Sequence, residues 1–180
     1  MTVRPVLEIG DPRLRQISAP LPAELCGSAA LADLIEDLRD TMAATDGAGL
    51  AAPQIGVPLR VVIFGFHHNP RYPEAPPIPE TILINPEITP LGEAIERGWE
   101  GCLSVPGLRA EIVRARRIRY KALTPKGQRL ERTVEGFHAR VVQHECDHLD
   151  GILFPDRLPP ATRAILGAAA ASTGPASRTP

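Results

Sequence analysis

Residues 137–149 constrain the fold most, because they combine the apolar pattern of a buried helix with polar side chains that need partners. On an α-helix His144 and His148 project from one face one turn apart, and Glu145 lies about 100° round from His144. Four apolar residues indicate that this helix is substantially buried: Val141, Val142, Cys146 and Leu149. A metal ion would satisfy both imidazoles at once, since unpaired buried polar groups are costly. A solvated polar helix gives the same H-E-x-x-H match, so the motif alone leaves both interpretations open.

The rest of the chain predicts one earlier helix and several strands. Apolar spacing over residues 28–47 predicts a helix with Ser28 as N-cap and Gly47 as terminator, and Gly151 is expected to end the second helix. The proline-rich residues 67–80 predict a surface loop without regular structure. Strands are expected at 59–66, 81–88 and 116–123, with a turn at 124–128 leading into a hairpin partner. The order helix, strands, helix predicts an α+β fold with the second helix laid against the sheets.

Length and composition predict a single domain over residues 1–158, followed by a short Ala/Pro-rich tail at 159–180 that is partly disordered. A short helix could follow Pro160. The formal net charge of −1 argues against a nucleic-acid-binding surface or a polybasic membrane patch. No apolar run approaches the roughly 18 residues that span a bilayer. The odd, sparse set of three cysteines suits a reducing compartment.

A third ligand is needed to decide which kind of metal site this would be. The astacin-like pattern places a third histidine where this chain has Phe154, and the thermolysin-like pattern needs a glutamate that does not occur after Glu145. Among the cysteines, Cys102 in the turn-like stretch EGCLSVPG is the best candidate, although a small buried hydrophobe is the commoner fate of a free cysteine. Cys146 points away from the histidine face, and Cys26 has no polar neighbours in sequence.

Three segments together resemble one family. GAGLAAPQ at residues 47–54, EGCLS at 100–104 and QHECDHLDG at 143–151 occur in the order and spacing of the peptide deformylases, which remove the N-formyl group from nascent polypeptides. DPRLR at residues 11–15 also fits, and the similarity runs from about Val6 to Leu158. The resemblance implies an α+β fold in which antiparallel sheets pack around a central helix that carries the HExxH metal motif.

Carried over residue by residue, the resemblance makes Cys102, His144 and His148 the ligands of one divalent metal ion per chain. It implies Fe²⁺ as the favoured ion, with Zn²⁺, Ni²⁺ or Co²⁺ as alternatives. Glu145 becomes the general acid/base. The oxyanion is expected to be stabilised by the side-chain amide of Gln54 and the backbone N–H of Leu103. Three protein ligands leave a fourth position for water, which is typical of catalytic rather than structural sites.

The substrate implied by the resemblance is an N-formylmethionyl peptide, and several residues are candidates for binding it. Gly47 and Gly49 would let an extended peptide bond along the backbone, although they could simply end the first helix. Phe137 and Val141 are candidates for lining the methionine pocket, with plain core as the alternative. Arg109 corresponds to a family arginine near the site entrance and could instead be solvated.

Partners and location follow from the same resemblance. We expect transient ribosome association, no direct nucleic-acid binding, no membrane contact, and a cytoplasmic, bacterial-type location (organellar if a transit peptide has been removed). Some bacterial members dock at the ribosome through a basic C-terminal helix, but after Leu158 this chain offers only Arg163 and Arg178. The loop at 67–80 is longer than in the shortest members and is expected to reshape one rim of the site. Glu100 could orient a ligand.

Two other function classes compete with a deformylase. An H-E-x-x-H metallopeptidase that cleaves internal peptide bonds is disfavoured by the missing downstream ligand. A peptide-binding module that has lost catalysis is disfavoured because every catalytic element is present.

Overall fold

The computed structural model describes residues 2–163 and places two helices among seven strands. All pairings between neighbouring strands are antiparallel, in a five-stranded sheet of order β1-β2-β3-β6-β7 and a two-stranded β4-β5 ribbon. The elements are α1 (Ala29–Ala44), β1 (Gly49–Ala51), β2 (Val61–Phe66), β3 (Ile78–Pro90), β4 (Ile95–Cys102), β5 (Val105–Ala115), β6 (Arg117–Leu123), β7 (Arg129–Glu135) and α2 (Gly136–Leu149), with short 3₁₀ turns at Pro12–Arg15, Ala23–Leu25, Ala52–Ile55 and Phe154–Arg157.

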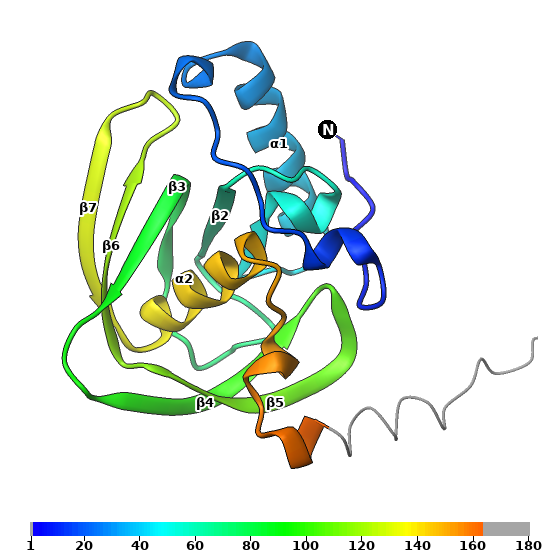
Figure 1. The fold of residues 1–180 in the computed structure, drawn as a ribbon, viewed down its shortest axis with the longest axis vertical. Coiled ribbons are helices and arrows are strands. Elements are labelled where there is room, and N and C mark those ends of the chain that lie inside the picture. The colour runs from blue at the N-terminus through cyan, green and yellow to red at the C-terminus, as the bar shows by residue number, and fades with distance from the viewer. Residues whose placement is uncertain (1, 164–180) are drawn as a thin grey trace, which may run out of the picture.

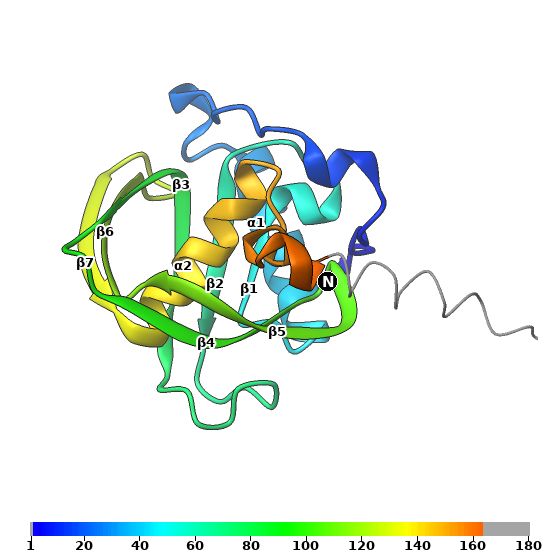
Figure 2. The same cartoon turned by 60° about the horizontal axis from the view of Figure 1, so that its bottom comes forward.

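The five-stranded sheet carries a helix on each face, which explains the unbroken apolar run of β2. Val62 and Phe64 pack in the cluster that contains α2, whereas Val61 and Ile63 pack in the cluster that contains α1. Successive side chains of a strand point to opposite faces, so a strand covered on both sides needs apolar residues throughout. Figures 1 and 2 show α2 in the middle of the molecule, between this sheet and the β4-β5 ribbon. The α+β architecture with antiparallel sheets around a central helix is therefore confirmed.

Most of the predicted helix ends are confirmed, and one is wrong. The Ser28 hydroxyl caps α1 by accepting from the Leu31 N–H at 3.2 Å, and Gly151 follows α2 with φ of 70°. Gly47 does not terminate α1, which ends at Ala44 with Thr45 as its C-cap. A Cβ on Gly47 would lie 3.1 Å from Cγ of Met42 and 3.2 Å from Cδ1 of Leu103, so close packing explains this glycine.

The loop predicted over residues 67–80 is wrong at its end, because β3 already begins at Ile78. Pro79 lies in a bulge where Phe64 pairs with Thr81 and Phe66 pairs with Ile78. A bulge tolerates proline because it leaves a residue without a ladder hydrogen bond.

The β4-β5 ribbon was not predicted. Cys102 ends β4 and pairs with Val105 across the turn at residues 103–104, so the turn-like stretch expected around it is present. The ribbon lacks the apolar pattern of a strand in its sequence, because charged residues and glycines occupy its solvent-exposed positions. The predicted hairpin of β6 and β7 is confirmed.

The predicted division into a domain of residues 1–158 and a tail at 159–180 stays a prediction. Residues 160–163 have helical backbone, as expected after Pro160, and residues 164–180 lie outside the described part of the chain. Among the described residues, no helix has both the length and the apolar character to cross a membrane.

Gly151 provides a test of how α2 is joined to the N-terminal segment. A Cβ on Gly151 would lie 2.5 Å from the carbonyl oxygen of Arg15, whereas a Cβ on Gly92, which has φ of 74°, would meet nothing within 4 Å. Gly92→Ala is expected to lower the free energy of unfolding by ~1–2 kcal/mol, the cost of a left-handed backbone. Gly151→Ala is expected to cost a further ~1–3 kcal/mol through overpacking. Urea unfolding of both variants measures the difference, and equal losses would contradict the close contact.

Candidate metal centre and active site

Three side chains of the metal-ligating type meet between β4 and α2. The ligand atoms of Cys102, His144 and His148 all lie within 4.8 Å of one another. The Cys102 Sγ lies 3.2 Å from the Nε2 of His148. Cys102 is 4% exposed and His148 is 2% exposed. The fold thus brings together the three predicted ligands, and their binding of a metal stays a prediction.

The electrostatics of this group favour a metal ion. Burial opposes ionisation of Cys102, but the neighbouring His148 and His144 outweigh it and hold the pKa of the thiol well below its usual value. The thiolate is the form of cysteine that binds metals. One sulfur with two imidazole nitrogens suits zinc, iron, cobalt or nickel, so the residues present fit a divalent ion.

Glu100 fixes the orientation of His144. Glu100 is 2% exposed, and its Oε2 lies 2.9 Å from the Nδ1 of His144. Burial opposes ionisation of Glu100, but Arg114 and His144 outweigh it and lower the pKa of the carboxyl far below its usual value. The ionised carboxylate of Glu100 accepts a hydrogen bond from the N–H at Nδ1 of His144. The other ring nitrogen, Nε2, then carries no proton and faces Cys102 and His148. The expectation that Glu100 could orient a ligand agrees with this contact.

Two buried arginines that the sequence reading missed hold Glu100 in turn. Arg114 donates to both carboxylate oxygens at 2.9 Å, and Arg140 donates to Oε1 at 2.8 Å. Arg140 also donates to the carbonyl oxygens of Ile112 at 2.9 Å and Glu96 at 2.8 Å. The available signal was an arginine one turn before His144 on a helix already judged to be buried, because a buried charge requires a partner.

Glu145 lies against the backbone of β1. It is 4% exposed, and burial raises its pKa to about 7. Within the described residues its Oε2 is buried without a hydrogen-bond partner. A Cβ on Gly49 would lie 2.5 Å from Oε1 of Glu145, so only glycine leaves room for this carboxylate. From the sequence, Gly49 was expected to allow close approach of a peptide, and its packing against Glu145 was not expected.

Gln54 points its amide at the same centre. The Nε2 of Gln54 lies 3.5 Å from the Cys102 Sγ and donates to the Ser104 hydroxyl at 3.1 Å. Its Oε1 accepts from the Ala51 N–H at 2.8 Å, which fixes the amide nitrogen toward the cysteine. Leu103 follows Cys102 directly and lines a cavity beside the ligand group.

A cavity of ≈ 30 Å³ adjoins the ligand group. Phe137 and Val141, the predicted pocket residues, line it together with Tyr72, Arg140, Glu145 and Gln54. Gly47 and Arg109 are not part of this lining; Arg109 lies over the ring of Tyr72, with 5.0 Å between its Cζ and the ring centroid. His67 and His68 are exposed, as expected of surface histidines.

Comparison with known proteins decides the family. The family model described as polypeptide deformylase matches residues 3–164, which is most of the chain. The chain belongs to the polypeptide deformylase family. Enzymes of this family are metal-dependent hydrolases, and the endopeptidase alternative is not favoured.

Curated relatives agree over nearly their whole length. The chain is 56% identical to peptide deformylase 2 of Pseudomonas syringae pv. tomato over 156 residues, covering 87% of each protein. It is 58% identical to peptide deformylase 1 of Prochlorococcus marinus over 159 residues, covering 88% of this chain and 82% of that protein.

Solved structures show the same fold. A class I type b peptide deformylase from Acinetobacter baumannii with bound Met-Ala-Ser is 42% identical, with a TM-score of 0.85 over 87% of this chain and 99% of that chain. The peptide deformylase of Ehrlichia chaffeensis, in complex with actinonin, is 31% identical with a TM-score of 0.83 over 98% of this chain and 100% of that chain.

The contact between Glu100 and His144 predicts an effect on metal affinity. Glu100→Gln keeps the shape but removes the negative charge that orients the His144 ring. Such a change is expected to weaken metal binding ~10- to 100-fold. Competition with a chelator measures the affinity.

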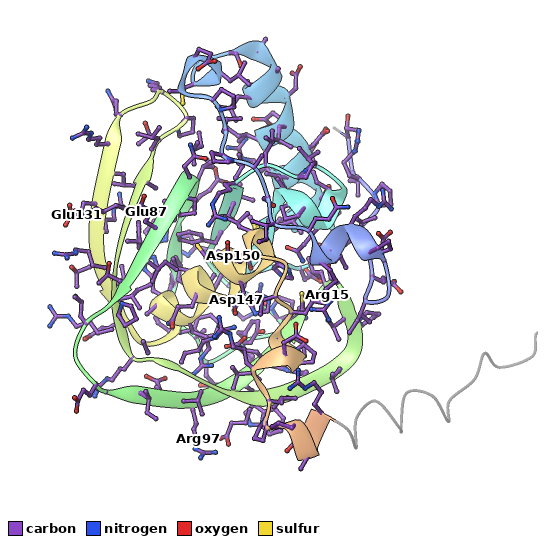
Figure 3. The ribbon with its side chains drawn as sticks, viewed as in Figure 1. Arg15, Glu87, Arg97, Glu131, Asp147 and Asp150 are labelled. Atoms are coloured by element: carbon purple, nitrogen blue, oxygen red, sulfur yellow. The ribbon has the colours of Figure 1, made fainter. Side chains whose placement is uncertain are left out.

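A matched control is Glu131→Gln, because Glu131 is a 51% exposed carboxylate on β7 and lies on the outside of the molecule (Figure 3). Its metal affinity should equal that of the wild type. Equal affinities of the Glu100→Gln variant and the wild type would show that Glu100 does not orient a ligand.

Proposed function

We propose that this chain hydrolyses the N-formyl group of N-formylmethionyl peptides and releases formate, with Glu145 as its general acid/base. One observation carries the proposal. Three segments far apart in sequence bring Gln54, Cys102, His144 and Glu145 to one cavity, and His148 lies beside Cys102. These are the residue types that metal-assisted amide hydrolysis requires.

Cys102, His144 and His148 would hold one divalent ion, for which Fe²⁺ is our first choice and Zn²⁺, Ni²⁺ and Co²⁺ are the alternatives. When bound, such an ion supplies Lewis acidity that polarises the formyl carbonyl and acidifies water. Glu100 keeps the His144 ring turned toward the ion.

Glu145 takes the proton from the attacking water and delivers one to the departing amine. The Oε2 atom suits this task, because it has no hydrogen-bond partner among the described residues and can accept a proton from water. Burial, which raises the pKa of this carboxyl, favours its taking up a proton during the reaction.

The oxyanion of the tetrahedral intermediate would be met by the Gln54 amide and the backbone N–H of Leu103. The bond from Ala51 to the Gln54 side chain holds the amide in place before substrate arrives. Donors that need no reorganisation are worth more in a buried site than in water, and losing one costs on the order of 10²–10³ in turnover.

Phe137 and Val141 would contact the methionine side chain of the substrate. The relative from Acinetobacter baumannii binds Met-Ala-Ser. This supports the proposal that a peptide beginning with methionine binds in the same place in this chain. Gly47 and Gly49 would lie along the peptide, and Arg109 would lie near the entrance. Transient ribosome association and a cytoplasmic location complete the proposal, since the substrates are nascent chains.

The direct test is formate release from formyl-Met-Ala-Ser by protein purified without oxygen and loaded with iron, nickel or cobalt. We expect turnover by the wild type and a loss of at least ~10²-fold in kcat for Glu145→Gln with metal content unchanged. Absence of formate with all three metals would contradict the function. Full activity of Glu145→Gln would contradict the role of this residue.

Gly49→Ala is expected to lower kcat while leaving metal content intact. The added Cβ would meet the Glu145 side chain at 2.5 to 2.8 Å and push its carboxylate out of place. A displacement of about 1 Å at a catalytic group can cost on the order of 10² in rate. Steady-state kinetics and elemental analysis measure the two quantities, and wild-type kcat in this variant would show that Glu145 has room to move.

A further inference from the structure

The loop at residues 67–77 contacts the end of β4 through the hydroxyl group of Tyr72. The Tyr72 Oη accepts a hydrogen bond from the N–H of Gly101 at 3.1 Å and donates to the carbonyl oxygen of Gly101 at 3.4 Å. Gly101 directly precedes Cys102 in β4 and lines the cavity. The Tyr72 side chain is therefore hydrogen-bonded to both the N–H and the carbonyl oxygen of Gly101.

These main-chain groups lie where an extended peptide would bind. The cavity lies between β1, which is an edge strand of the five-stranded sheet, and the end of β4. A peptide residue that pairs with a strand edge donates its N–H to a carbonyl and accepts an N–H with its own carbonyl. The Tyr72 hydroxyl makes the same two bonds to Gly101.

The cavity beside the ligand group is small at its inner end. Its volume is ≈ 30 Å³, room for two or three water molecules at ~10–15 Å³ each. Arg71, Tyr72 and Phe137 also line a wider groove of ≈ 620 Å³. Among the walls, α2 and the strands belong to the core, whereas Tyr72 and Arg71 come from a loop.

Local hydrogen bonds and ring contacts hold this loop in place. The Nδ2 of Asn69 donates to the Asp46 carbonyl at 3.0 Å, and Arg109 donates to the Arg71 carbonyl at 3.2 Å. The Tyr72 ring lies 4.9 Å from that of Phe137, between centroids. Breaking the Tyr72 bonds would release the main-chain groups of Gly101 while leaving these other contacts of the loop in place.

We propose that Tyr72 determines the affinity for substrate, by occupying the positions on Gly101 that the peptide backbone takes and so holding the loop of residues 67–77 over the pocket. This inference rests on the proposed function, since it assumes a peptide substrate. Substrate then competes with the Tyr72 hydroxyl, and the apparent affinity falls in proportion to the closed fraction.

The test compares Tyr72→Phe with the wild type, using full-length, metal-loaded protein and formyl-Met-Ala-Ser. The variant keeps the ring against Phe137 and loses both bonds to Gly101. We expect KM to fall about 3- to 10-fold, with kcat within about twofold. The control is Tyr120→Phe, since Tyr120 is buried in the core and does not line the cavity, and its KM should stay at the wild-type value.

An unchanged or raised KM for Tyr72→Phe would overturn the proposal, because Tyr72 would then be an ordinary wall of the pocket. Calorimetric binding of Met-Ala-Ser separates this question from catalysis. Tighter binding by Tyr72→Phe in a protein that releases no formate would support the competition and contradict only the deformylase activity. Equal or weaker binding would overturn the competition whatever the activity.

Discussion

The buried carboxylate of Glu100 connects the β4-β5 ribbon with α2, the two elements that carry the ligand group. It accepts hydrogen bonds from Arg114 on β5 and from Arg140 on α2, and contacts His144 on α2. Glu100 and Cys102 are two residues apart on β4, so both side chains leave the strand on the face toward α2. The interaction that aligns the ribbon with the helix thus also sets the cysteine opposite the histidines.

Arg114, which binds Glu100, also forms an ion pair with Asp147 on α2. Arg114 donates to Asp147 at 2.5 Å, and Arg157 pairs with the same carboxylate from the other side. Asp147 lies near the C-terminal end of α2 (Figure 3). Buried ion pairs of this kind contribute little net stability, because desolvation offsets their attraction, but removing one partner is costly. In this fold the pairs join β4, β5 and α2, because Glu100, Arg114 and Asp147 come from these three elements.

The sequence predicted α2 and its polar face well, because a helix that repeats every 3.6 residues shows its buried side directly. It also predicted Cys102 as the third member of the group, by exclusion and by resemblance. Arg140 was missed because an arginine near a helix start is commonplace, and only the fold shows it beneath Gly98, where a Cβ would lie 2.9 Å from its guanidinium. Tyr72 was missed because a proline-rich loop gives no periodic signal, and its contact with Gly101 spans 29 residues. Long-range polar contacts of this kind depend on tertiary structure.

We expect Cys102, His144 and His148 to bind one ion together. The direct measurement is X-ray absorption at the metal edge of the zinc-loaded protein. It should show one sulfur at ~2.3 Å and two imidazole nitrogens at ~2.0–2.1 Å per ion. A spectrum without a sulfur neighbour, or with fewer than two imidazoles, would contradict it.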